Sequence, residues 1–203
     1  MRRSGVESGA STVREDILIL MARRLFLFDR PDRFIPGTIG EPGQRTFYLQ
    51  AREGARTVSV SLEKIQVAAL AERLRALLDE LERRDLVPAV ETPEDAAPLD
   101  EPLNEAFRAG TLSIGWDAQS RLIVIEARDG SFEEDADEPD EYEDDDPDGP
   151  DLVRVRLVAA EARAFAVRAE QVVGAGRPPC PLCGQPLDPQ GHICPRRNGR
   201  YLH

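Results

Sequence analysis

Three cysteines and one histidine near the C-terminus are the residues whose types and spacing best support chemistry. Cys180 and Cys183 form a Cys-x-x-Cys pair, and His192 and Cys194 follow after eight further residues. Residues two apart in an extended chain point to the same side, so the second pair can also share one ion. Four ligands in two pairs fit a closed tetrahedral zinc site. We therefore predict one structural zinc ion bound by these four residues.

Two other interpretations of the cysteines stay open. They are either ordinary thiols in an unstructured tail or a redox Cys-x-x-Cys pair. A redox pair usually opens a helix after a strand, and Pro179 and Pro181 do not suit a helix. Zinc with four protein ligands has no open position for a substrate, so we expect a structural ion. A Pro- and Gly-rich tail this short cannot build a core, and the metal would supply the folding energy.

A small basic patch stands beside the predicted zinc ligands. It consists of Arg196, Arg197 and Arg200, with Tyr201 next to them. Basic patches on zinc modules often bind protein or nucleic acid, and three arginines with one aromatic residue are a weak form of this signal. We expect a contact with protein or nucleic acid through these arginines.

A second candidate site lies in a turn-rich segment, residues 29–45, that holds three prolines and three glycines. Its charged and polar side chains could form a carboxylate and arginine site for an anionic small molecule. The simpler alternative is a set of turn-capping aspartates and a salt bridge. The segment lacks the Lys-Ser/Thr of a P-loop and has no helix directly after it. The candidate binding residues are Asp32, Arg33, Glu41, Gln44 and Arg45.

The charge of the chain is concentrated in one segment. The net charge is −12, but twelve of the 38 acidic residues lie between Glu133 and Asp148, where no basic residue occurs. The rest of the chain holds 26 acidic and 26 basic residues and is neutral. The acidity therefore says little about partners of the folded part. Lys64 is the only lysine, and we attribute the excess of arginine to GC-rich coding.

The cysteine distribution and the apolar runs indicate a compartment. All three cysteines lie in the last 24 residues, whereas a secreted disulfide scaffold spreads an even number along the chain. No apolar run approaches the ~18 residues that a membrane helix needs. Ile17–Leu20 is too short for a signal-peptide core. We expect a cytoplasmic protein with no membrane segment.

Hydrophobic periodicity predicts six strands and two helices. Alternating apolar and polar residues mark most of the strands, and apolar residues at steps of three and four mark the helices. The expected strands are Arg24–Phe28, Thr46–Arg52, Thr57–Leu62, the segment around Leu112–Trp116, Leu122–Ala127 and Leu152–Leu157. The expected helices are Glu63–Arg84 and Ala159–Val173.

This order, βββα-βββα, predicts an α+β fold with an antiparallel sheet of about six strands and both helices on one face. The two halves have the same shape, although their residues hardly repeat. We expect three regions: a flexible or non-native extension at 1–20, an α+β domain at 21–173 and a zinc knuckle at 174–203. Within the domain, 130–150 is expected to be an acidic disordered loop.

Two stretches resemble an uncharacterised actinobacterial family, DUF3090, a domain of unknown function. They are Phe28-Asp-Arg-Pro-Asp-Arg-Phe34 with its continuation to Ala51, and the cysteine-containing tail from Gly176 to Arg196. The resemblance covers about Met21 to Tyr201 and implies an actinobacterial cytoplasmic protein. It brings no reaction, substrate or catalytic residue.

Two function classes follow from these residues. The first is a binding or adaptor protein whose zinc knuckle supports a contact with protein or nucleic acid. The second is an enzyme with its site in the Asp29–Arg45 loop. The two histidines, His192 and His203, both lie in the tail, and the body therefore has no histidine base. We favour the binding protein, and leave open whether the chain is an enzyme.

Overall fold

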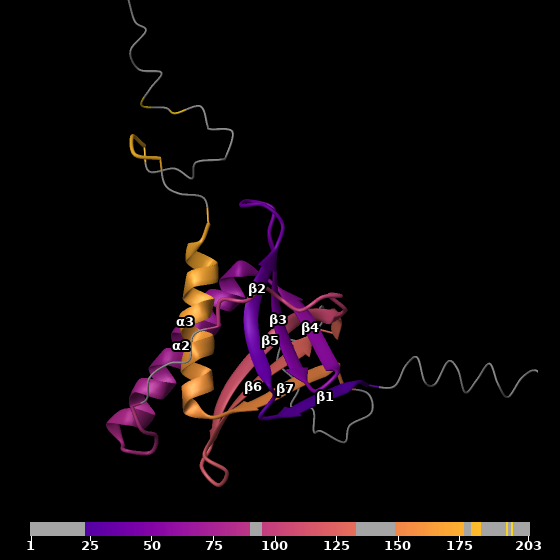
Figure 1. The fold of residues 1–203 in the computed structure, drawn as a ribbon, viewed down its shortest axis with the longest axis vertical. Coiled ribbons are helices and arrows are strands. Elements are labelled where there is room, and N and C mark those ends of the chain that lie inside the picture. Colours follow the sequence, from indigo (N-terminus) through magenta and orange to yellow (C-terminus); the bar gives the residue numbers. More distant parts are fainter. Residues whose placement is uncertain are drawn as a thin grey trace, which may run out of the picture.

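A computed structural model describes residues 23–89, 95–132, 149–176, 180–183, 194 and 196, and these contain one seven-stranded sheet and two α-helices (Figure 1). The strands are β1 (Leu25–Asp29), β2 (Arg33–Ile39), β3 (Thr46–Glu53), β4 (Arg56–Leu62), β5 (Glu105–Asp117), β6 (Leu122–Asp129) and β7 (Leu152–Leu157). The helices are α2 (Lys64–Arg83) and α3 (Ala159–Gly174), and a 3-10 turn, η1, spans Gly130–Phe132. The α+β class and both helices are confirmed.

The sheet is mixed and has the strand order β1-β7-β6-β5-β4-β3-β2. β4 pairs with β5 in parallel, β1 pairs with β7 in parallel, and the other four pairings are antiparallel. The predicted antiparallel sheet of about six strands is therefore wrong in both strand direction and strand number. The parallel β4–β5 pair follows from α2, because a helix between two strands carries the chain back to its starting edge.

The missed strand is β2, which lies within the segment expected to be a loop. Pro36 and Gly37 sit in the middle of β2 and gave it the composition of a turn. Proline is tolerated because β2 is an edge strand, so one side of it needs no ladder hydrogen bonds. The repeated unit is consequently β2-β3-β4-α2 and β5-β6-β7-α3, with β1 as an additional strand.

The sheet is strongly curved, and its two edges approach each other. β1 and β2 lie at opposite edges of the strand order, yet only residues 30–32 join them. Four residue steps span at most about 14 Å, so the edges must come together at this end. The Arg56 guanidinium, on β4, lies 4.5 Å from the centre of the Phe28 ring on β1. Arg56 Nη1 also donates to the Leu27 carbonyl over 3.3 Å.

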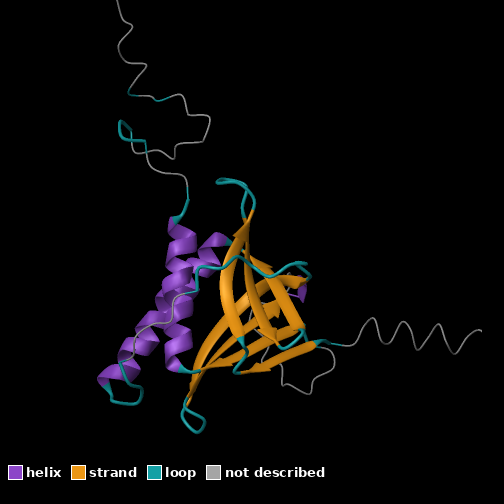
Figure 2. Cartoon of the chain, in the orientation of Figure 1, coloured by secondary structure: helices purple, strands orange, loops and turns teal. Residues whose placement is uncertain are grey.

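Both helices pack together against one face of this curved sheet (Figure 2). Phe34 of β2 stacks on Phe165 of α3 with ring centroids 4.8 Å apart. The apolar stripe of α2 is completely or almost completely buried: Val67, Leu70, Leu74, Leu78 and Leu81. One continuous core therefore joins the sheet to both helices.

The opposite face of β2, β3 and β4 is covered by residues 95–104, which we call the strap. Gln50 of β3 is 1% exposed, and its side chain is fixed by the strap. Its Nε2 donates to the Asp100 carbonyl over 3.0 Å, and its Oε1 accepts from the Asp100 amide over 2.7 Å. This pair of bonds satisfies a buried amide that would otherwise be costly to bury. The Leu86–Glu105 stretch is rich in Pro, Asp and Glu, a composition that predicts a linker or long loop. It is thus partly an ordered cover.

Several expected regions lie wholly or partly outside the described residues. The extension at 1–20 is among them, and so is most of the acidic loop, whose first residues form η1. Within the described ranges, neither helix has the length and apolarity needed to cross a lipid bilayer.

Replacing Gly37 with alanine should loosen the strap. A Cβ at Gly37 would lie 2.6 Å from Cγ of Leu99, a buried residue of the strap. We expect Gly37→Ala to lower the free energy of unfolding by about 1–3 kcal/mol, measured by urea denaturation.

The control is Gly115→Ala, where no atom lies within 4 Å of the added Cβ. Combining Gly37→Ala with Leu99→Ala should cost less than the sum of the two single changes, because the second change removes the clash. Additive losses would show that Gly37 does not contact the strap through this position.

Candidate metal centre

The three cysteines come together although ten or more residues separate Cys194 from the other two. The sulfur atoms of Cys180, Cys183 and Cys194 all lie within 4.8 Å of one another. Cys180 and Cys194 are buried, and Cys183 is half-buried. All three are free thiols. The cysteine cluster is thus a potential metal site made from both halves of the predicted motif.

The sulfur spacing distinguishes metal binding from a disulfide. Cys180 Sγ and Cys194 Sγ are 4.0 Å apart. A disulfide needs about 2.05 Å. Two thiolates on a tetrahedral zinc ion, each with a Zn–S bond of about 2.3 Å, lie about 3.8 Å apart. The observed separation therefore fits two ligands of one metal ion.

Local hydrogen bonds favour the thiolate form of Cys180. The backbone amides of Leu182 and Cys183 donate to the Cys180 sulfur, and these bonds lower the pKa of its thiol from 9.0. Residues 181–183 form the turn that aims these amides at the sulfur. Arg196 Nη1 donates to the Leu182 carbonyl over 3.0 Å and so links the second half of the motif to this turn.

The fourth predicted ligand, His192, lies outside the described residues, as do Arg197 and Arg200 of the basic patch. Arg196 is exposed, and one of its N–H groups donates to the turn. The structure thus assembles three of the four predicted ligands, and they already fit a metal with soft ligands.

Comparison with known proteins places the chain in one family. The model of a family described as "Protein of unknown function (DUF3090)" matches residues 26–194. The chain belongs to the DUF3090 family. No curated protein and no solved structure matches the chain. The matched range of this DUF3090 protein ends on Cys194, so it includes all three cysteines of the cluster.

The predicted loop site is divided between the two ends of β2. Asp32 and Arg33 stand at its start, whereas Glu41, Gln44 and Arg45 follow its end, about 20 Å of strand away. Asp32 Oδ2 accepts from the Gly54 amide over 2.7 Å, which ties the β1–β2 connection to the β3–β4 turn. The structure therefore does not bring these five residues to one place.

Arg33 is committed to holding the strap. Its side chain is 10% exposed and forms five hydrogen bonds, one for each of its N–H groups. The Nε and Nη2 pair binds both oxygens of Asp95, at 2.6 and 2.9 Å. The remaining bonds go to Asp100 Oδ1 and to the carbonyls of Ala97 and Pro98. These five bonds use all of its hydrogen-bonding capacity.

Asp95 and Arg168 complete this contact, and the sequence alone did not identify either. Arg168, on α3, donates from Nε to the Pro36 carbonyl over 2.9 Å and from Nη2 to the Ala97 carbonyl over 2.7 Å. Burial lowers the pKa of Arg168, and the nearby Asp95 partly opposes this. Asp95 belonged to an expected linker, and Arg168 is one of 25 arginines, so neither carried a signal.

The Glu41–Arg45 segment forms the tip of the β2–β3 hairpin. The Gln44 amide donates to the Glu41 carbonyl over 2.9 Å, and Gly40 and Gly43 both have φ of 101°, which only glycine adopts easily. Gly40 and Gly43 thus supply the backbone conformation that the turn requires. Arg45 points back to the body and donates from Nη1 to the Ala175 carbonyl, at the end of α3, over 2.7 Å.

Acid should release the strap through Asp95. Its hydrogen bonds with Arg33 lower the pKa of Asp95 from 3.8 to about 2. A carboxyl whose pKa is lowered by folding adds stability above its unfolded pKa and loses it as the pH falls toward the folded value. We expect stability to decline between about pH 4 and pH 2, and Asp95→Asn to remove part of that decline.

Urea denaturation at several pH values measures this effect. Asp95→Asn should also be less stable than the wild type at pH 7, because Arg33 loses its charged partner. The matched control is Glu72→Gln on the exposed side of α2. An equal acid dependence in the wild type and in Asp95→Asn would show that this carboxyl has an ordinary pKa.

Proposed function

We propose that Cys180, Cys183, Cys194 and His192 bind one structural zinc ion, and that this DUF3090 protein is a binding protein. The convergence of three free thiols within 4.8 Å is the observation that carries the proposal. Three thiolates this close need a cation to offset their repulsion. The ligand spacing provides a place for the imidazole, and Cys3His is a common structural zinc set.

The role of the ion would be to fold the tail. Three thiolates, one neutral imidazole and a divalent ion leave a charge of −1, which nearby arginines can offset. Arg196 supports this arrangement, because it bonds to the carbonyl of Leu182 inside the Cys-x-x-Cys turn. With four protein ligands the ion has no open position for a substrate, and its chemistry is structural.

The contacts in the body favour a binding protein over an enzyme. The alternative was a carboxylate and arginine site for an anionic small molecule in the Asp29–Arg45 loop. Asp32 instead caps a turn, and all five N–H donors of Arg33 bind residues of the strap. We propose that a protein or nucleic acid contacts the knuckle through Arg196, Arg197 and Arg200.

An actinobacterial origin and a cytoplasmic location are also proposals. The excess of arginine over lysine supports the first, because GC-rich coding favours arginine. Free thiols that bind metal support the second, because such sites require reducing conditions.

Purified protein should contain about one equivalent of zinc by elemental analysis. Cys183→Ser and His192→Ala should each lower the zinc content and raise the rate at which a chelator removes the ion. His203→Ala is the matched control, because it removes the other histidine of the tail. A metal-free protein with three freely titratable thiols would disprove the zinc site.

Single-stranded RNA should bind weakly and with strong salt dependence, if the basic patch contacts nucleic acid. If three arginines contact phosphates, a plot of the logarithm of the binding constant against the logarithm of the salt concentration should have a slope of about −2. Combining Arg197→Ala and Arg200→Ala should flatten this slope, whereas Arg83→Ala on α2 should not. Binding that is unchanged between low and high salt would contradict a contact between this patch and nucleic acid.

A further inference from the structure

A cavity lies where the β2–β3 hairpin, the start of α2 and the end of α3 meet. Its volume is about 550 Å³, within the range of small-molecule sites. It is lined by Pro42, Gly43, Arg45, Phe47, Lys64, Val172, Val173, Gly174 and Gly176. The described lining thus has two cationic side chains and no carboxylate. We call it the hairpin cavity.

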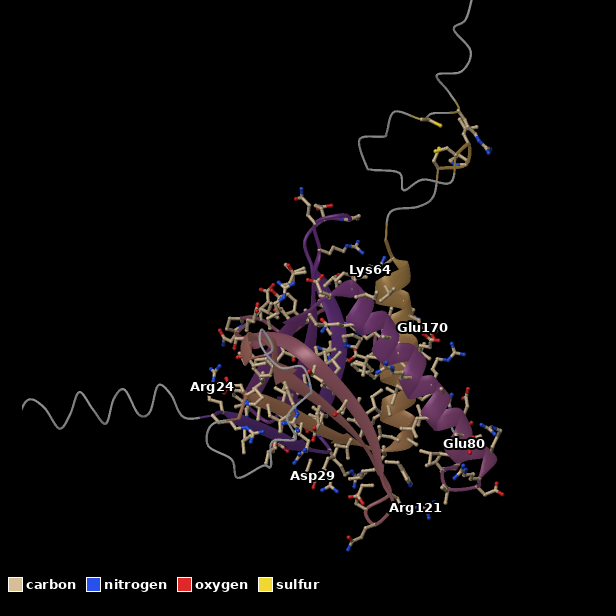
Figure 3. The ribbon with its side chains drawn as sticks, turned by 180° about the vertical axis from the view of Figure 1, so that it is seen from behind. Arg24, Asp29, Lys64, Glu80, Arg121 and Glu170 are labelled. Carbon is tan, nitrogen blue, oxygen red and sulfur yellow. The ribbon has the colours of Figure 1, made fainter. Side chains whose placement is uncertain are left out.

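Lys64 is the first residue of α2 and the only lysine in the chain. Its side chain makes no hydrogen bond or ion pair with any residue that the structure describes. Its ammonium lies 3.4 Å from the position of a Cβ built on Gly176, so the glycine leaves room beside it. Figure 3 shows Lys64 at the end of the body where α3 also ends. All three of its N–H donors are therefore available.

Arg45 also has donors available, in contrast to Arg33. Its Nη1 donates to the Ala175 carbonyl, and this bond fixes the guanidinium in place. Its Nε is buried and has no partner among the described residues. In Arg33 the Nε and Nη2 pair binds both oxygens of a carboxylate. Neither Nε nor Nη2 of Arg45 has an acceptor in the described part of the chain, and a buried donor such as this Nε is normally satisfied.

The acidic residue next to Lys64 in the sequence does not neutralise the positive charge of the hairpin cavity. Glu63 precedes Lys64, but its side chain caps the N-terminus of α2 and pairs with Arg108. The N-terminus of α2 adds partial positive charge near Lys64. Among the residues that the structure describes, the lining therefore has two cationic side chains that no acidic side chain neutralises.

We propose that the hairpin cavity binds a phosphate monoester that carries a small apolar group. A phosphate monoester offers three terminal oxygens, two for the Arg45 Nε and Nη2 pair and one for Lys64. A carboxylate offers only two. Phe47, Val172 and Val173 line the cavity with apolar surface that suits the organic part. This site is independent of the zinc site and uses none of its residues.

Calorimetric titration of the full chain with phenyl phosphate tests the proposal. We expect one saturable site, with affinity reduced roughly tenfold or more by Lys64→Met, because hydrogen bonds to charged groups are strong. Arg45→Lys should reduce it similarly, because lysine keeps the charge but loses the paired donors. Lys64→Met should leave the circular dichroism and unfolding unchanged, since the Lys64 ammonium makes no hydrogen bond or ion pair with a described residue.

The matched control is Arg73→Ala, which removes one positive charge from an exposed position on the same helix. It should change the affinity by less than about twofold. Benzoate should bind more weakly than phenyl phosphate. Three results would each overturn the proposal: no saturable binding at millimolar phenyl phosphate, an equal loss in Arg73→Ala, or equal binding of benzoate.

Discussion

The three-residue connection between β1 and β2 is the constraint on which the rest of the structure depends. These strands lie at opposite edges of a seven-stranded sheet, so a short connection can join them only if the sheet curls. The contact of Arg56 with Phe28 across the curled sheet shows the result. Curling gives the sheet a concave apolar face, which α2 and α3 fill together, and a convex face on which the strap lies.

Two arginines at the two ends of β2 illustrate how the same side chain serves different purposes. Arg33 meets the strap, and each of its N–H groups has an acceptor, so it can only stabilise structure. Arg45 meets the end of α3, where one bond orients it and its buried Nε is left without a described partner. The paired donors of Arg33 hold a carboxylate of the strap. The paired donors of Arg45 have no described acceptor and can bind a ligand. The difference comes from the neighbours that the fold supplies.

The tail that holds the cysteine cluster differs from the body in what would stabilise its fold. The body has a core of buried apolar side chains from every strand and both helices. The sequence of the tail has few large apolar residues, so thiolates and a metal would replace hydrophobic burial as the source of its folding energy. This division explains why the metal is proposed as a structural element and why the hairpin cavity, built on the rigid body, is the better place for a small ligand.

The sequence by itself determined both helices, six of the seven strands and the spacing of the cysteines, because periodicity and ligand spacing are local properties. It could not reveal β2, since Pro36 and Gly37 have the composition of a turn and are allowed only because that strand became an edge. The parallel pairings, the partner of Arg33 and the convergence of Arg45 with Lys64 were decided by tertiary structure alone. Each joins residues far apart in the chain, and such contacts depend on how the whole sheet curls rather than on any local pattern.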